Sequence, residues 1–150
     1  GELRMVIAIA EGGPKKHPSR DAMDHCAETS PLYQGWLDTV DPDLRAAEDA
    51  IARRHLPDLG AVMERSALTM HASMWAAQPA IRYFKPVTLA LIDAVEGFRD
   101  GGALAFYTMD AGPHVKVLTT AEHADELQQA LAQVAGVREV LISKPGPGIE

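Results

Sequence analysis

The sequence predicts a single α+β domain in which an antiparallel or mixed sheet of about four strands packs against helices. Apolar residues at helical spacing occupy most of the first half of the chain, and short β-prone runs occupy the second half. The chain closes in the order strand, turn, strand, helix, strand, which is typical of a ferredoxin-like half. A length of 150 residues fits one domain, so we treat residues 1–150 as one unit.

The first half begins with a strand and continues with helices. Arg4–Ala10 is a short apolar run typical of a buried strand. The next segment, EGGPKKHP, predicts a loop because its glycines and prolines interrupt regular structure. Ser19 stands where a helix N-cap belongs. Helices are expected at 19–29, from Ser30-Pro31 onward with Ser30 as the cap, from Asp41 onward, and at 58–77.

The second half alternates helices and strands. Gly101-Gly102 is a strong helix stop, and Thr120 is placed to cap the last helix. The expected elements are a helix at 88–99, strands at 103–109 and 115–119, a helix at 120–135 and a strand at 137–143.

Charge and composition narrow the class of partner. The formal net charge of −7 and the isoelectric point of about 5.3 disfavour nucleic acid or a membrane surface. Cys26 is alone, so no intrachain disulfide can form, which suits a reducing cytoplasm. No apolar run approaches the ~20 residues of a membrane span, and no signal peptide is visible. The opening Gly1-Glu2 fits a trimmed chain or a fragment of a longer polypeptide.

An acidic turn, Asp110-Ala111-Gly112-Pro113, interrupts two β-prone runs. Gly112 adds no side-chain bulk and Pro113 fixes φ, so the backbone can approach a ligand closely beside a fixed carboxylate. A carboxylate at a strand end can point into a cleft and orient or accept a hydroxyl proton. The alternative is an aspartate that only accepts hydrogen bonds from turn amides, and the residue pattern leaves both open.

A basic segment, Lys15-Lys16-His17-Pro18-Ser19-Arg20, leads into the first expected helix. The N-terminus of a helix offers free N–H groups and the positive end of its dipole, which together favour anions. Arg20 supplies a guanidinium fork suited to phosphate oxygens, and Ser19 supplies a hydroxyl. The segment is a candidate phosphate site, with an exposed loop and an ordinary serine cap as the alternative.

The remaining polar residues predict no further catalytic centre. His71 lies inside a long expected helix, where a packed histidine is favoured over a metal ligand. His25 and Cys26 are adjacent on a helix, so their side chains point apart. The histidines show no zinc-ligand spacing, and no glycine-rich phosphate loop or Walker sequence is present. We therefore expect no metal ligand and no complete nucleoside triphosphate site in this chain.

Several motifs, taken in order, resemble those of one family. They are Lys15-Lys16, Ser19-Arg20-Asp21-Ala22-Met23, Glu28-Thr29-Ser30, Met70-His71-Ala72, Gln78-Pro79-Ala80 and Asp110-Ala111-Gly112-Pro113-His114. From about residue 4 to residue 149 the chain is similar to the C-terminal half of bacterial-type diphosphomevalonate decarboxylases, which belong to the GHMP kinase superfamily. Two positions depart from the family pattern: Ala22 stands where glycine is usual, and His114 where asparagine is usual. We expect Ala22 to narrow the backbone approach to a phosphate, and His114 to change the hydrogen bonding around Asp110.

This resemblance implies a fold, a reaction and a set of roles. The implied fold is the ferredoxin-like C-terminal domain of GHMP kinases, with an antiparallel sheet of about four strands. The implied reaction phosphorylates the 3-hydroxyl of mevalonate 5-diphosphate with ATP and then releases phosphate and CO2 to give isopentenyl diphosphate. Asp110 is the implied catalytic residue, placed against that hydroxyl. The implied substrate-binding residues are Ser19, Arg20, Lys15, Lys16, Ala111 and Gly112.

The resemblance also implies what lies outside the chain. ATP and Mg2+ would bind mainly to an N-terminal domain that is absent here, so the isolated domain is expected to be inactive. The full enzyme is expected to be a cytoplasmic homodimer.

Three other functions stay open at this point. The departures at Ala22 and His114 leave room for decarboxylation of mevalonate 5-phosphate. A stand-alone module could bind a phosphorylated small acid without catalysis, and a dimerisation domain would need neither activity nor ligand. A relative that only phosphorylates the 3-hydroxyl is disfavoured because it would not be expected to keep Asp110.

Overall fold

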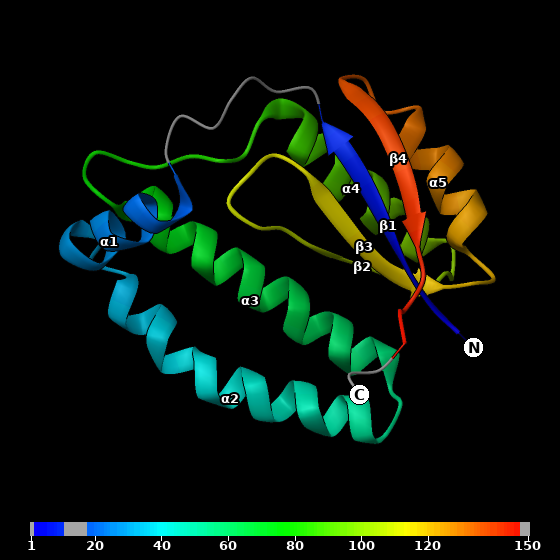
Figure 1. Cartoon of the computed structure of the whole chain (residues 1–150), viewed down its shortest axis with the longest axis horizontal. Coiled ribbons are helices and arrows are strands. Elements are labelled where there is room, and N and C mark those ends of the chain that lie inside the picture. The colour runs from blue at the N-terminus through cyan, green and yellow to red at the C-terminus, as the bar shows by residue number, and fades with distance from the viewer. Residues whose placement is uncertain (1, 11–17, 148–150) are drawn as a thin grey trace.

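A computed structural model describes residues 2–10 and 18–147 of the chain. This part contains four strands, as expected from the sequence, and five helices. Figure 1 shows their arrangement. The elements in order are β1 (Leu3–Ala10), α1 (Ser19–Thr29), α2 (Tyr33–Ala52), α3 (Leu56–Ala76), α4 (Pro86–Asp100), β2 (Ala105–Thr108), β3 (Val115–Thr120), α5 (Ala124–Ala132) and β4 (Val137–Ser143).

The four strands form one antiparallel sheet in the order β2-β3-β1-β4. Val6 of β1 pairs with Val117 of β3 on one side and with Ile142 of β4 on the other. β1 and β2 therefore run parallel with β3 between them, and β3 and β4 run parallel with β1 between them. These are two interleaved split βαβ units. The antiparallel α+β prediction is confirmed, and the ferredoxin-like label stays an interpretation of this strand order.

Helices α4 and α5 cover one face of the sheet, the far face in Figure 1. Alternate residues of β1, Val6 and Ala8, point to this face and are fully buried. Leu91 of α4 and Leu127 and Leu131 of α5 pack against them with no exposed surface. Each such leucine stabilises the fold by roughly 1.5–3 kcal/mol relative to an exposed position.

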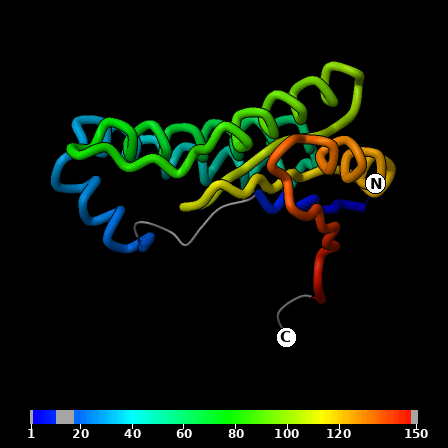
Figure 2. The backbone as a smooth tube through the Cα atoms, turned by 90° about the horizontal axis from the view of Figure 1, so that it is seen from above, coloured from blue at the N-terminus to red at the C-terminus, as the bar shows by residue number. Residues whose placement is uncertain are grey.

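Helix α3 packs beside the edge strand β2, and α2 lies on the outer side of α3 (Figures 1 and 2). The contact depends on Gly60, because a Cβ at this position would overlap the ring of Phe106. The Glu64 carboxylate accepts hydrogen bonds from Arg99 Nη1 at 2.7 Å and from the Tyr107 backbone N–H at 3.1 Å. These bonds tie α3 to both α4 and β2, which fixes the edge of the sheet that leads to residue 110.

Two predicted helix starts in the first half are wrong. No new helix begins at Asp41, because α2 runs through Pro42 to Ala52. A proline inside a helix removes one backbone hydrogen bond, and the ion pair between Asp43 and Arg65 of α3 helps to hold this stretch in place. Helix α2 begins at Tyr33 and not at Ser30-Pro31. The Ser30 hydroxyl donates to the Ser73 carbonyl at 2.6 Å and accepts a hydrogen bond from the Leu32 N–H at 3.3 Å, so Ser30 belongs to the turn before the helix.

The last helix is shorter than predicted. Thr120 closes β3, a three-residue turn follows, and α5 begins at Ala124 and ends at Ala132. The Ala121 N–H donates to the Glu2 carbonyl at 2.8 Å, which keeps the chain in the sheet one residue longer. Within the described residues, no helix has the length and apolar character needed to cross a membrane.

Candidate substrate-binding site at the Asp110 turn

The acidic turn joins β2 to β3, as the sequence predicts. The Gly112 N–H donates to the Asp110 carbonyl at 2.7 Å, which makes the turn compact. Ala111 and Gly112 are buried, whereas Asp110 is exposed. The turn thus directs its acidic side chain outward and keeps its small residues inward.

The Asp110 carboxylate forms an ion pair with the ammonium group of Lys116, a residue of β3. The two side chains are 73% and 30% exposed, so solvent screens the pair and its stabilising effect is about 0–1 kcal/mol. Its main consequence is orientation of the carboxylate. The sequence analysis missed Lys116, although strand alternation from Val115 places it on the opposite face of the sheet from the core.

Helix α4 anchors the turn from the protein interior. The hydroxyl of Thr88, which has no exposed surface, donates to the Pro113 carbonyl at 3.0 Å. The Thr88 hydroxyl oxygen also accepts a hydrogen bond from the Lys85 N–H at 3.1 Å. Thr88 therefore links the start of α4 to the acidic turn, and no motif in the sequence pointed to it.

Helix α1 packs against the same turn. Ala22 and Cys26 of α1 form a buried cluster with Ala111 and Tyr83. This packing brings the start of α1 next to the β2–β3 hairpin, and the tip of the hairpin faces that end of the helix in Figures 1 and 2. Ala22 is 1% exposed, so its methyl group lies in the cluster and not at the surface where a phosphate would approach.

Ser19 and Arg20 form the exposed first turn of α1. The predicted capping role of Ser19 is wrong, because Pro18 occupies the N-cap and Ser19 is the first helical residue. Its hydroxyl is consequently not used as a cap. The helix start, with its free N–H groups, lies on the side of the acidic turn. Lys15 and Lys16 lie outside the described residues.

His71 packs behind the acidic turn and is 2% exposed. Its ring lies 4.7 Å from the Phe84 ring and 6.2 Å from the Tyr83 ring, measured between centroids. Burial lowers the pKa of His71, while the backbone and carboxylate of Asp110 act in the opposite direction. Neither ring nitrogen has a partner in standard hydrogen-bond geometry in the described part of the chain, although the Asp110 backbone is near enough to act on the pKa. The packed-histidine prediction is confirmed, and proximity to Asp110 was not foreseen.

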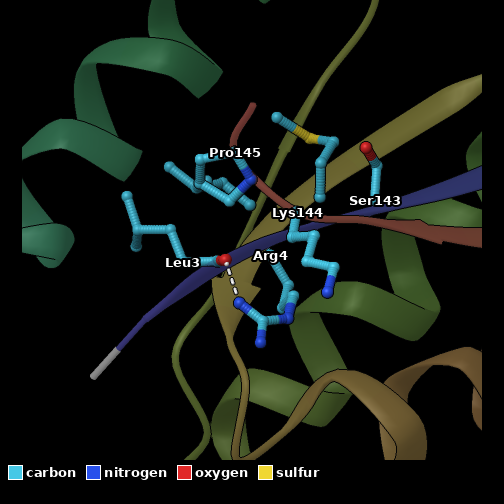
Figure 3. Close-up of a pocket in the computed structure, with 7 residues that line it drawn as sticks. Leu3, Arg4, Ser143, Lys144 and Pro145 are labelled. Atoms are coloured by element: carbon cyan, nitrogen blue, oxygen red, sulfur yellow. Dashed lines mark hydrogen bonds between the residues drawn. The ribbon is translucent and has the colours of Figure 1, made fainter. Parts of the chain in front are cut away.

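A shallow pocket of about 210 Å³ lies at the other end of the sheet (Figure 3). Arg4 Nη1 donates to the Leu3 carbonyl at 2.8 Å beside it. Leu3 pairs with Thr120, the end of β3 farthest from the acidic turn, so this pocket is separate from the predicted site. Its lining consists of Leu3, Arg4, Met5, Leu118, Ser143, Lys144 and Pro145.

No metal centre is found among residues 2–10 and 18–147, where no three His, Cys, Asp or Glu side chains gather around a common point. An acid beside a helix start that favours anions can orient a hydroxyl of a phosphorylated molecule.

Fold and site together define the class: an α+β domain with a four-stranded antiparallel sheet, carrying an acidic turn beside a helix start. Residues 5–144 match the family model described as "Mevalonate 5-diphosphate decarboxylase C-terminal domain". This match covers most of the chain, which therefore belongs to the mevalonate 5-diphosphate decarboxylase C-terminal domain family.

Individual relatives agree with this family. Diphosphomevalonate decarboxylase ERG19 of Gibberella zeae is 30% identical over 145 residues, covering 92% of this chain and 38% of the relative. The solved mevalonate diphosphate decarboxylase of Enterococcus faecalis, studied for ATP binding mediated by mevalonate diphosphate, superposes with a TM-score of 0.88. It is 35% identical over 98% of this chain and 44% of its own.

A third relative is the solved complex of MDDEF with MVAPP, AMPPCP and magnesium, which has a TM-score of 0.85 and 33% identity. The match covers 96% of this chain and 47% of that one. The present chain thus spans less than half the length of these three relatives.

Proposed function

We propose that this chain is the C-terminal half of an ATP-dependent decarboxylase that converts mevalonate 5-diphosphate to isopentenyl diphosphate, ADP, phosphate and CO2. The enzyme is a lyase of isoprenoid biosynthesis, and residues 1–150 form its substrate-binding domain. The observation that carries this proposal is the packing of α1 on the acidic turn, which puts an anion-favouring helix start beside the hairpin that carries Asp110.

In the proposed reaction, Asp110 is the catalytic residue. Its carboxylate accepts a hydrogen bond from the 3-hydroxyl of the substrate and orients that oxygen for phosphorylation. Lys116 pairs with the carboxylate before substrate arrives. Orientation by a fixed group lowers the barrier because the reacting atoms need not find each other by diffusion.

The diphosphate end of the substrate binds at the start of α1. Arg20 donates paired N–H groups to phosphate oxygens, and Ser19 donates its hydroxyl. Lys15 and Lys16 add positive charge for binding the diphosphate. Ala111 and Gly112 belong to the proposed substrate-binding turn. Both are buried and the Gly112 N–H is bonded within the turn, so their contribution is to keep the turn compact beneath Asp110.

Nucleotide and metal bind mainly in the half of the protein that precedes this domain. ATP with Mg2+ supplies the phosphoryl group when bound there. The described residues do not offer a metal-binding cluster, so we assign no step of this domain to the ion. It follows that the isolated domain is inactive.

The full-length protein forms a cytoplasmic homodimer in this proposal. Helix α2 supports association because it exposes Leu37, Val40, Leu44 and Ile51, at i, i+3, i+7 and i+14 along one stripe. Light scattering on the full-length protein at micromolar concentration should give twice the chain mass, and a monomer would contradict the dimer.

The direct test of function is turnover by the full-length protein with ATP and Mg2+. Mevalonate 5-diphosphate and mevalonate 5-phosphate are compared by release of CO2 and ADP. We expect turnover of the diphosphate. Turnover of the monophosphate alone would shift the assignment to a mevalonate 5-phosphate decarboxylase. Binding of either compound without CO2 release would support a non-catalytic binding module.

A further inference from the structure

The turn that carries Asp110 lies where the ladder between β1 and β3 stops. Ala8 pairs with Val115, so a continued ladder would bring Ala10 opposite Pro113. The Pro113 carbonyl already accepts the hydroxyl of Thr88 at 3.0 Å, and proline has no N–H to donate. The β3 backbone therefore does not supply the hydrogen bonds that a strand pair would normally form at Ala10 and Pro113.

The side chain of His114 replaces the missing backbone hydrogen bond to Ala10. Its Nδ1 accepts a hydrogen bond from the Ala10 backbone N–H at 3.2 Å. An accepting Nδ1 implies that the neutral ring carries its proton on Nε2. Ala10 is 3% exposed, so loss of this acceptor would leave a buried N–H unsatisfied.

We propose that His114 is a positioning residue for Asp110. The inference rests on the proposed function, because Asp110 is the group proposed to act on the substrate hydroxyl. The exposed carboxylate is held at its tip by Lys116, whose long side chain is adaptable. The position of the carboxylate therefore depends on the hydrogen bonds that hold the backbone of the turn. Thr88 anchors the turn to α4, and His114 anchors it to the end of β1.

The test compares His114→Ala with His114→Asn in the full-length protein. Asparagine Oδ1 is as many bonds from Cα as histidine Nδ1 and can accept the same hydrogen bond. We expect His114→Ala to lower kcat for mevalonate 5-diphosphate about tenfold, because a displaced catalytic group reacts more slowly. We expect His114→Asn to keep kcat within about threefold of the natural enzyme. KM should change little in both variants, because His114 is not among the residues proposed to bind the substrate.

Amide hydrogen exchange at Ala10 gives a readout that does not need activity. Exchange should accelerate in His114→Ala and stay slow in His114→Asn. Full activity in His114→Ala, or an equal loss in both variants, would overturn the positioning role. An unchanged exchange rate at Ala10 in His114→Ala would show that the hydrogen bond from the Ala10 N–H to His114 does not form. If the natural enzyme turns over neither substrate, the proposed function fails first, and that result is distinct from a difference between variants.

Discussion

Thr88→Val tests whether the anchor on α4 matters to the chemistry of the acidic turn. The substitution keeps the shape of the side chain but removes the hydroxyl that donates to the Pro113 carbonyl and accepts from the Lys85 N–H. The site has no exposed surface. A polar group left without its partner costs about 1–3 kcal/mol, and water at the exposed Lys85 offsets part of this. We therefore expect a loss of about 1–3 kcal/mol in the free energy of unfolding.

Thr119→Val is the matched control. Thr119 is equally buried, and its hydroxyl donates to the Leu104 carbonyl at 2.6 Å, but it lies toward the other end of β3. Both variants should unfold at lower urea concentration than the natural full-length enzyme. Only Thr88→Val should also reduce kcat, by about tenfold, measured where all three proteins are folded. Equal kcat in the two variants would refute the idea that the Thr88 bond positions Asp110.

Three further predictions concern the packing and charge around the site. Burial lowers the pKa of His71 from the usual 6.5, so the unfolded chain binds a proton on this ring more tightly than the folded chain does. The neutral ring therefore contributes stability above about pH 6.5, and this contribution is lost as the pH falls toward the pKa of His71 in the folded chain. In a series of urea-unfolding measurements at different pH, His71→Phe should flatten this part of the curve. Gly60→Ala should lower the free energy of unfolding by about 1–3 kcal/mol, because the added methyl group would overlap the Phe106 ring. Gly97→Ala, whose methyl group would meet open space on a helix, should raise the free energy of unfolding by about 0.5–1 kcal/mol. A change of the same sign in both variants, measured by urea unfolding, would contradict this packing. Arg20→Ala should raise KM for mevalonate 5-diphosphate about tenfold or more without lowering kcat, and Arg45→Ala, an exposed control on α2, should leave both unchanged in steady-state kinetics.

Much of the fold could be predicted from the sequence because its signals are local. The glycines at 101–102 end α4 within one residue of the expected position, and the β-prone run at 137–143 is β4 itself. The helix start predicted at Asp41 is wrong. Proline is a strong local signal for a helix start, but here the long-range packing of α2 on α3 keeps one helix continuous through Pro42. Local patterns carry no information on such contacts.

The site was predictable only in part, for the same reason. Asp110 and the Ser19-Arg20 start stand out as unusual residue combinations. Lys116, Thr88 and His71 do not, because a lysine on a strand or a threonine in a helix gains meaning only from its neighbours in space. The role assigned to Asp110 itself stays a prediction until it is measured.

That measurement is kcat of Asp110→Asn in the full-length enzyme, beside Asp93→Asn, an exposed control on α4. The substitution leaves the turn backbone intact, so both variants should fold and bind mevalonate 5-diphosphate. We expect Asp110→Asn to lose at least about 100-fold in kcat, in line with removal of a group that orients or accepts a proton, while Asp93→Asn stays at the natural rate. Undiminished turnover by folded Asp110→Asn would contradict the account.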